Sequence, residues 1–379
     1  MIRNKMDSFK NFIRNKFFNK SPIYSIGNYE GKRVLVSYLT DGFNKDHFEN
    51  YNTNRIECSY IVNWFVINGY CVDIADCNDI GFKGNVSYDV IFGFGAPFNN
   101  SHLTSTGKKI LYCTEAHPNF SFKEESDRCI YFYERHNIKH PLVRSGTYYK
   151  SEDYQDKYSY IVLGDRNSTY LVDQLGIESN KVKTIYPTGI EPLFDLYVKD
   201  SDYISRDILW LGSRGLIHKG LDILIESFIY SKVECKLHVC GITYKQFKSI
   251  YKDINLDLHN VIFYGKVDVR TSKFETILKK CGFISLLSCS EACSTGVTTG
   301  MRHALIPIVT KSCDVNVDGL GFYIEGKDIP SIASELSSII NEDNKLLSDM
   351  SKRSKIIAND LYSIEHFKNS INMALSSLI

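Results

Sequence analysis

The chain has 379 residues, of which 43% are apolar, and its 45 Lys and Arg stand against 44 Asp and Glu. This length allows two ordinary domains, and the near-zero net charge leaves no global electrostatic footprint for nucleic acid, so we expect no nucleic-acid partner. The 11 Cys form no CxxC pair, which favours reduced thiols in the cytoplasm, and no apolar run reaches the roughly 18 residues of a membrane span.

The first 20 residues depart from this neutral balance, with six Lys or Arg and one Asp. Their apolar side chains fall on one helical stripe, made of Ile2, Met6, Phe9, Ile13 and Phe17. A basic amphipathic helix over residues 1–20 suits an anionic membrane surface, which would make the protein peripheral on the inner face of the cell membrane. The alternative is a helix docked on its own domain, or a frayed leader.

From residue 33 onward, short apolar runs alternate with helical segments. We expect strands within residues 33–39, 71–76, 88–95, 109–118, 158–165 and 181–190. We expect helices at residues 55–70, closed by Gly69, and at residues 166–177. Strands that alternate with helices predict βαβ units and a mostly parallel sheet.

The same pattern restarts after residues 191–207. We expect further strands at residues 208–213, 236–241, 260–267, 282–288 and 306–310, and helices at 219–230 and 363–379. The chain is therefore predicted to be α/β, with two doubly wound halves and a boundary near residues 187–203. Ligands of such sheets bind beyond the carboxyl ends of the strands, and two facing halves form a cleft.

The connection LGSRGLIHKG follows the strand at residues 208–213 and carries Arg214 and Lys219. Its glycines let a ligand approach the backbone, and the following helix N-terminus favours an anion. Arg forks onto phosphate oxygens and Lys adds a point charge. We interpret this connection as a diphosphate clamp; the alternative is two surface cations on a loop.

The stretch SCSEACSTGVTTGM follows another strand of the same half. Ser294, Thr295 and Gly296 are expected to present backbone N–H groups to an anion at the start of a helix. Glu291 is expected to accept hydrogen bonds from ligand hydroxyls. The alternative, compatible with the first, is a helix capped by Ser or Thr.

Two further candidates lie in the N-terminal half. His117 follows the fourth strand at its carboxyl end, where we expect a role in the site; Glu115 is a neighbouring acid that can serve equally. The alternative is an incidental His in a Pro-containing loop. Asn52, Thr53 and Asn54 precede the first helix, and these residue types suit a helix N-cap.

Metal-ligating residue types are present without a recognised pattern. His136 and His140 have a helical spacing compatible with a metal, but the sequence positions no third ligand. Cys281, Cys289 and Cys293 lack a metal-binding spacing. We therefore expect no metal site.

Four stretches, in this order and spacing, resemble the C-terminal half of the retaining GT-B glycosyltransferases of the large family 4. They are residues 208–228, 261–268, 282–310 and 321–336, and residues 182–194 resemble the turn into that family's interdomain linker. The resemblance spans about residues 33–379. It is detailed in the C-terminal half and a matter of topology in the N-terminal half.

The resemblance implies a GT-B architecture of two Rossmann-like domains facing a cleft. It places an acceptor domain at residues 21–195 and a nucleotide-sugar donor domain at 196–361, with a C-terminal helix, about 362–379, returning to the first. It also implies a metal-independent hexosyltransferase without a cofactor, which transfers a sugar with retention from a nucleoside diphosphate sugar. With the basic leader, we expect a saccharide or lipid-linked acceptor in bacterial cell-surface polysaccharide synthesis.

By position, the resemblance implies that Arg214 and Lys219 contact the donor diphosphate and that Glu291 reads hydroxyls of the donor sugar. His117 lies where the family often places a His against that sugar, so the implied catalytic residues are His117, Glu291, Arg214 and Lys219. The implied donor-binding residues are Gly212, Ser213, Arg214, Lys219, Gly265, Val267, Glu291, Cys293, Ser294, Thr295 and Thr299. The family uses the loop after its first strand to position acceptor and phosphate, which implies such a role for Asn52, Thr53 and Asn54, with Glu115 as a further candidate.

Thr299 departs from the family's pattern, which has a second Glu at this position to hold the nucleotide ribose. A Thr gives a single hydrogen bond and no charged bidentate contact. This substitution leaves the ribose contact open and motivates an alternative function, a nucleotide-sugar-binding protein with little or no transfer activity. A GT-B epimerase, which needs no acceptor, is a third hypothesis.

Overall fold

A computed structural model describes residues 24–40, 53–82, 87–100, 107–145, 148–156, 158–191, 203–252 and 254–379. The predicted basic helix at residues 1–20 and the candidate Asn52 lie outside these residues. The described residues form two compact units. The first comprises those up to Cys113 with Glu152–Ile161 and Ala374–Ile379, and the second comprises Thr114–Ser151 and Val162–Met373.

One sheet of the described residues has seven strands in the order β1-β3-β2-β4-β5-β6-β7. Its strands are β1 (Tyr24–Gly27), β2 (Arg33–Tyr38), β3 (Cys71–Asp76), β4 (Val90–Gly93), β5 (Lys108–Cys113), β6 (Ser159–Leu163) and β7 (Val182–Ile185). Strands β2 to β5 pair in parallel through runs of buried Val, Leu and Ile, as predicted. Strand β1, which the sequence pattern did not indicate, adds to β3 in antiparallel orientation.

The helices of this part of the chain follow the predicted alternation. They are α2 (Thr53–Ile67), α3 (Gly95–Asn99), α4 (Pro118–His136) and α5 (Asp165–Thr169), and α5 continues into a π-helical turn, Tyr170–Gln174. Helix α4 belongs to the second unit. Its Phe132 is fully buried in the core of that unit, and its Arg135 forms an ion pair of 2.9 Å with the buried Asp222. The predicted domain bounds, 21–195 and 196–361 with 362–379, stay a prediction.

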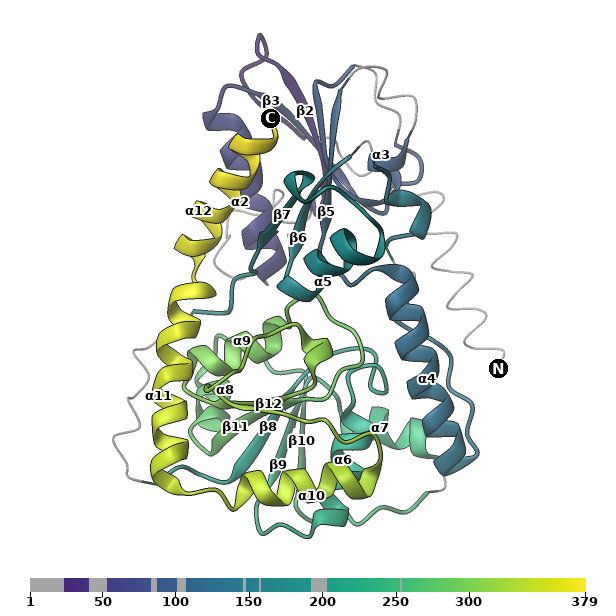
Figure 1. Cartoon of the computed structure of the whole chain (residues 1–379), viewed down its shortest axis with the longest axis vertical. Helices are drawn as coiled ribbons and strands as arrows, with labels where there is room; N and C mark the ends of the chain where they lie inside the picture. The colour runs from purple at the N-terminus through teal and green to yellow at the C-terminus, as the bar shows by residue number, and fades with distance from the viewer. Residues whose placement is uncertain are drawn as a thin grey trace. The chain divides into compact units, whose positions relative to one another are not determined.

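The second unit contains a six-stranded sheet in the order β10-β9-β8-β11-β12-β13 (Figure 1). Its strands are β8 (Asp207–Leu211), β9 (Leu237–Cys240), β10 (Val261–Gly265), β11 (Cys281–Leu286), β12 (Ile306–Val309) and β13 (Phe322–Tyr323). All neighbouring strands are parallel, which confirms the predicted α/β class. The two-residue β13 was not predicted.

Helices cover both faces of this second sheet (Figure 1). They are α6 (Leu221–Ser231), α7 (Tyr244–Tyr251), α8 (Ser272–Leu278), α9 (Thr295–Arg302), α10 (Ile329–Ile340) and α11 (Asn344–Leu361). Helix α12 (Ile364–Leu378) follows α11 along the chain. Trp210 of β8, Leu224 of α6 and Leu336 of α10 are fully buried in one apolar core. Burial of large apolar side chains, each contributing about 1.5–3 kcal/mol, makes this sheet a firm support for the loops at its carboxyl edge.

The C-terminus returns to the first unit, as predicted. Residues Ala374–Ile379, the end of α12, belong to that unit. There the Lys108 ammonium donates to the backbone oxygens of Leu378, at 3.4 Å, and Ile379, at 2.8 Å. Among the described helices, none has the length and apolar content that crossing a bilayer demands.

Candidate functional site

Two loops meet at the carboxyl edge of the second sheet. One joins β8 to α6, and the other joins β11 to α9; β8 and β11 are neighbouring parallel strands, so their carboxyl ends lie side by side. Lys219 from the first loop places its Nζ 2.5 Å from Oε1 of Glu291 in the second. The structure thus brings together two residues, 72 positions apart, that the sequence pattern had singled out separately.

Glu291 is a nearly buried carboxylate that remains ionised. Besides Lys219, it accepts a hydrogen bond of 2.8 Å from the Ser288 hydroxyl. Burial alone raises the pKa of Glu291, but the charges of Lys219, His218 and Arg144 outweigh it and lower the pKa to about 2. Glu291 is therefore a pure hydrogen-bond acceptor at neutral pH, suited to hydroxyl groups.

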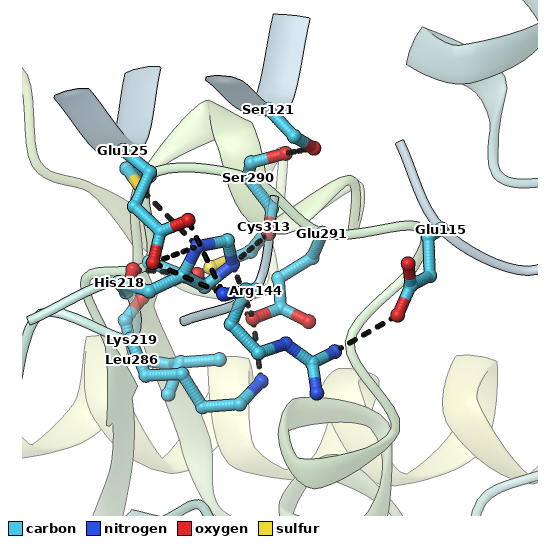
Figure 2. A network of polar contacts seen from close by, with 12 residues as sticks. Glu115, Ser121, Glu125, Arg144, His218, Lys219, Leu286, Ser290, Glu291 and Cys313 are labelled. Atoms are coloured by element: carbon cyan, nitrogen blue, oxygen red, sulfur yellow. Dashed lines mark hydrogen bonds and ion pairs between the residues drawn. The ribbon is translucent and has the colours of Figure 1, made fainter. Parts of the chain in front are cut away.

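His218 links this pair to a second buried carboxylate, Glu125 (Figure 2). Its Nε2 donates to the Ser290 carbonyl at 2.6 Å and lies 3.9 Å from Glu291, while its Nδ1 lies 3.8 Å from Glu125. The imidazole is 3% exposed, so it separates the two carboxylates without giving water access. Sequence reasoning missed both His218 and Glu125.

Glu125, on α4, accepts hydrogen bonds from the backbone N–H groups of residues 143–145. Its carboxylate accepts from the N–H groups of Val143 at 2.9 Å and Ser145 at 2.8 Å, and from the Ser145 hydroxyl at 2.6 Å. The Arg144 N–H adds longer contacts of 3.3 Å to both oxygens. Burial raises the pKa of Glu125, but the nearby His218 and the hydrogen bonds from Ser145 and the backbone outweigh this and hold the pKa at about 2.

Arg144 lies in this hydrogen-bonded segment, and its side chain points toward the Lys219–Glu291 pair (Figure 2). Its Nη2 lies 3.4 Å from Oε1 of Glu115. Burial raises the pKa of Glu115, and the nearby Arg144 opposes that rise. The candidate Glu115 therefore belongs to the same charged group as Glu291. The sequence pattern had placed Glu115 only beside His117.

His117 is the N-cap residue of α4. Its Nδ1 accepts a hydrogen bond of 3.3 Å from the Asn119 N–H, and its ring stacks on Tyr170 at 5.1 Å between centroids. Burial lowers its pKa to about 4, so the imidazole is neutral at physiological pH. These contacts give His117 a structural task, and its role toward a ligand stays a prediction.

The two cations of the predicted clamp, Arg214 and Lys219, have different surroundings in the structure. Ser213 and Arg214 are exposed, and among the described residues Arg214 makes no hydrogen bond or ion pair. The backbone N–H of Gly212 donates to the Cys240 carbonyl at 3.1 Å. Lys219 is thus built into the buried group, while Arg214 stands at the surface of the loop.

The start of α9 differs from the expectation in two ways. The Ser294 N–H donates to the Cys313 carbonyl at 3.0 Å, so this predicted anion donor is already engaged. Ser294 is the N-cap, but its hydroxyl makes no capping bond.

The residues around Ser294 shape the start of α9. Cys293 precedes Ser294 with a left-handed φ of 52°, and Thr295 is the first residue of the helix. A Cβ on Gly296 would lie 2.6 Å from the Leu211 carbonyl, so this glycine lets α9 approach β8.

Thr299 has a structural partner. Its Oγ1 accepts a hydrogen bond of 3.2 Å from the Ile190 N–H, and the hydroxyl lies in a buried contact between α9 and residues 189–190. Arg302, one turn further along α9, donates to the Gly189 carbonyl at 2.9 Å. Thr299, where the sequence resemblance led us to expect a second Glu, therefore helps to fix the segment that follows β7.

The remaining candidates have local contacts of their own. Gly265 ends β10 with a φ of 68°, and the half-buried Val267 packs against an apolar core. Thr53 and Asn54, in the first unit, open α2 and share a contact of 3.4 Å. A site role for these residues stays a prediction.

The histidines and cysteines weighed as metal ligands have other partners. The His136 Nε2 lies 2.8 Å from Glu226, and the half-buried His140 contacts the Pro141 carbonyl. Cys281, Cys289 and Cys293 are buried and form no disulfide. Throughout the described part of the chain, no group of three or more His, Cys, Asp or Glu is arranged to hold a metal. The expected absence of a metal and of any cofactor stays a prediction.

The fold is similar to solved structures, although no model of a protein family and no curated protein matches the sequence. A mutant of Staphylococcus aureus (S. aureus) TarM, in complex with Fondaparinux, alpha-GlcNAc-glycerol and UDP, has a TM-score of 0.51 and 17% identity, over 76% of this chain. This chain spans 55% of the length of that TarM.

Two further structures are covered almost completely. Anabaena HepE, in complex with UDP and glucose, has a TM-score of 0.56 and 12% identity, over 92% of this chain and 100% of HepE. WaaG, a glycosyltransferase involved in lipopolysaccharide biosynthesis, has a TM-score of 0.57 and 14% identity, over 90% of this chain and 99% of WaaG. At these identities the likeness establishes the fold, and the chain has the predicted GT-B fold.

The hydrogen bonds of the Glu125 carboxylate predict that the free energy of unfolding falls in acid. A carboxylate whose folded pKa is about 2, below its ordinary 4.5, stabilises the fold above the ordinary pKa, and that contribution is lost as the pH falls toward 2. Glu125→Gln should lower the free energy of unfolding at pH 7 by on the order of 3 kcal/mol. In urea unfolding, its deficit should shrink on acidification. Glu124→Gln, at the surface of the same helix, is the control; a deficit independent of pH would contradict the prediction.

The hydrogen bond between Thr299 and Ile190 predicts that removing the Thr299 hydroxyl lowers the free energy of unfolding. Thr299→Val leaves the buried Ile190 N–H without its acceptor, so the free energy of unfolding should fall by about 1–3 kcal/mol. Thr299→Ser keeps the hydroxyl and loses only a methyl group, at a cost of about 1 kcal/mol. Denaturant unfolding measures both, and a Val variant as stable as wild type would show that the hydroxyl is not needed there.

Proposed function

We propose that this chain is a glycosyltransferase that moves a sugar from a nucleoside diphosphate sugar to a saccharide or lipid-linked acceptor. The observation that carries the proposal is the buried Lys219–Glu291 pair at the carboxyl edge of a sheet in a GT-B fold. The UDP in the TarM and HepE structures supports a nucleotide donor. The description of WaaG supports a role in bacterial cell-surface polysaccharide synthesis.

The chemistry asks for positive charge where the sugar–phosphate bond breaks. Negative charge grows on the leaving diphosphate, and Lys219 is held in place to meet it, because Glu291 fixes its ammonium. Arg214, exposed on the same loop, can add a forked contact. The low dielectric around the nearly buried pair strengthens the interaction with Lys219, and we assign to Lys219 and Arg214 together the work of a metal ion.

The donor sugar would be oriented by hydroxyl contacts. Ionised Glu291 accepts hydrogen bonds from sugar hydroxyls. Neutral His117 can donate or accept one hydrogen bond without placing a charge beside the anomeric carbon. We propose transfer with retention, in which an oxygen of the donor phosphate takes the acceptor's proton. This route needs no separate general base, in contrast to the paired carboxylates of glycosidases.

One observation favours the second candidate function, a nucleotide-sugar-binding protein with little or no transfer activity. One of the two acceptor lone pairs of the Thr299 hydroxyl is already used by the Ile190 N–H. A ribose at this position would therefore gain less than the family's Glu provides. Weak donor binding without turnover is the behaviour expected of this alternative.

Binding and turnover separate the two functions. Lys219→Ala and Arg214→Ala should each weaken nucleoside diphosphate binding by about 1.5–3 kcal/mol in calorimetry, the scale of a hydrogen bond to a charged group. Lys123→Ala, which removes an exposed cation of α4, is the matched control and should bind as wild type does. Unchanged affinity in both test variants would refute the clamp. Binding without hydrolysis or transfer to any glycan acceptor would select the binding protein.

We also propose that residues 1–20 bind an anionic membrane surface and bring the enzyme to a lipid-linked acceptor on the inner face of the cell membrane. Six basic residues among the first 20 support this placement. Removing residues 1–20 should reduce sedimentation with liposomes that contain phosphatidylglycerol and leave nucleotide binding unchanged. Equal sedimentation of the two proteins would show that the leader is not a membrane anchor.

A further inference from the structure

The guanidinium of Arg166, at the start of α5, contacts no carboxylate among the described residues. Its Nη2 donates to the backbone carbonyl of Glu291 at 2.6 Å and to the side-chain oxygen of Asn167 at 3.1 Å. Both acceptors are uncharged. Arg135 of the same unit differs, because it contacts two carboxylates at 2.9 Å and 2.8 Å. The positive charge of Arg166 is therefore not neutralised by direct contact.

The carboxylate with the largest influence on this charge, Asp314, binds backbone instead of the guanidinium. Its Oδ1 accepts from the Arg166 N–H at 2.8 Å, and its Oδ2 accepts from the Asn167 N–H at 3.3 Å. Burial lowers the pKa of Arg166, and the charge of Asp314 opposes this without reversing it. The chain thus holds a cation that it only partly compensates.

Two of the three guanidinium nitrogens of Arg166 have no hydrogen-bond partner. Nε and Nη1 are shielded from solvent, and neither finds an acceptor among the described residues. The Phe120 ring lies over the guanidinium at 4.2 Å. A ring against the face of the guanidinium accepts none of the N–H groups that lie in its plane. A buried donor without a partner costs about 1–3 kcal/mol, and more when it is charged, so an incoming acceptor would recover this energy.

Arg166 lies next to the residue that we expect to read the donor sugar. Glu291 meets Lys219 with its carboxylate and Arg166 with its backbone carbonyl. In the proposed function, Lys219 and Arg214 serve the diphosphate. Arg166 is therefore a separate cation of the same site, reached from Glu291 by another route, and suits a different negative group.

The Phe120 ring is a cover that can turn aside. Phe120 and Arg166 are both half-buried, so the ring can rotate without opening an apolar core. Phe120 meets the Tyr170 ring edge-on at 6.1 Å, and Tyr170 stacks on His117 at 5.1 Å. The cover thus belongs to the aromatic group around His117, the second residue that we expect to face the sugar.

We propose that Arg166 binds an anionic oxygen group, a carboxylate or a phosphate, that a saccharide substrate carries and that approaches once the Phe120 ring turns aside. A planar guanidinium is well suited to the oxygens of either group. The inference rests on the proposed function and deepens it, because it names a substrate class: the donor sugar or the acceptor bears a negative charge besides the diphosphate. The sequence around residue 166 does not indicate this role.

Pairs of ligands that differ in one charged group test this inference by calorimetry. UDP-glucuronate against UDP-glucose reports a charge on the donor sugar. Glucose 6-phosphate against glucose, in the presence of UDP, reports a charge on the acceptor. In one of the two pairs, wild type should bind the anionic member about tenfold more tightly or better.

Variants of Arg166 should remove this preference. Arg166→Gln should bind both members of the pair equally, and Arg166→Lys should keep part of the preference, because it retains the charge on a single nitrogen. The ratio within each variant cancels general damage to the fold. Phe120→Leu keeps the guanidinium donors and should keep or increase the preference; its loss there would refute the ring as a cover. Lys123→Ala, an exposed cation of α4, is the matched control.

The outcomes separate this inference from the proposed function. No preference in either pair, or a preference that Arg166→Gln leaves intact, would overturn the inference. The proposed function then stands if Lys219→Ala still weakens nucleoside diphosphate binding. If wild type binds no nucleoside diphosphate, the proposed function fails. Glucose 6-phosphate against glucose, in wild type and Arg166→Gln, then still decides whether Arg166 binds an anion.

Discussion

The buried ion pair between Lys219 and Glu291 is the interaction on which the site depends. Burying either charge alone would cost several kcal/mol, and the pair is tolerable only because each charge meets the other at 2.5 Å. The two loops that supply these residues are fixed by neighbouring parallel strands, β8 and β11, in a closely packed sheet. Pairing holds the ammonium and the carboxylate in fixed positions.

A second layer of contacts supports this pair from the side of α4. Glu125 holds the backbone of residues 143–145, and His218 stands between Glu125 and Glu291. The segment that carries Glu115, Glu125 and Arg144 belongs to the same compact unit as the loops that carry Lys219 and Glu291. The charged group is thus assembled from three parts of the chain that lie far apart in the sequence.

The sequence predicted the alternation of strands and helices because buried strands and amphipathic helices have distinct apolar periods. It also predicted Lys219 and Glu291, since both follow a strand at a glycine- or serine-rich turn. It did not predict Arg144, Glu125 or His218, whose importance comes from tertiary contacts that no local spacing encodes. Thr299 shows the same limit: the sequence marked a missing acid, and only the structure shows a hydroxyl bound to Ile190.

A crystal structure of the full chain with the nucleoside diphosphate that raises its melting temperature most is the direct test of the central claim. The account predicts a phosphate oxygen within hydrogen-bonding distance of the Lys219 ammonium, with Glu291 still paired to it. A nucleotide bound away from the carboxyl edge of the second sheet, with the Lys219–Glu291 pair untouched, would contradict it.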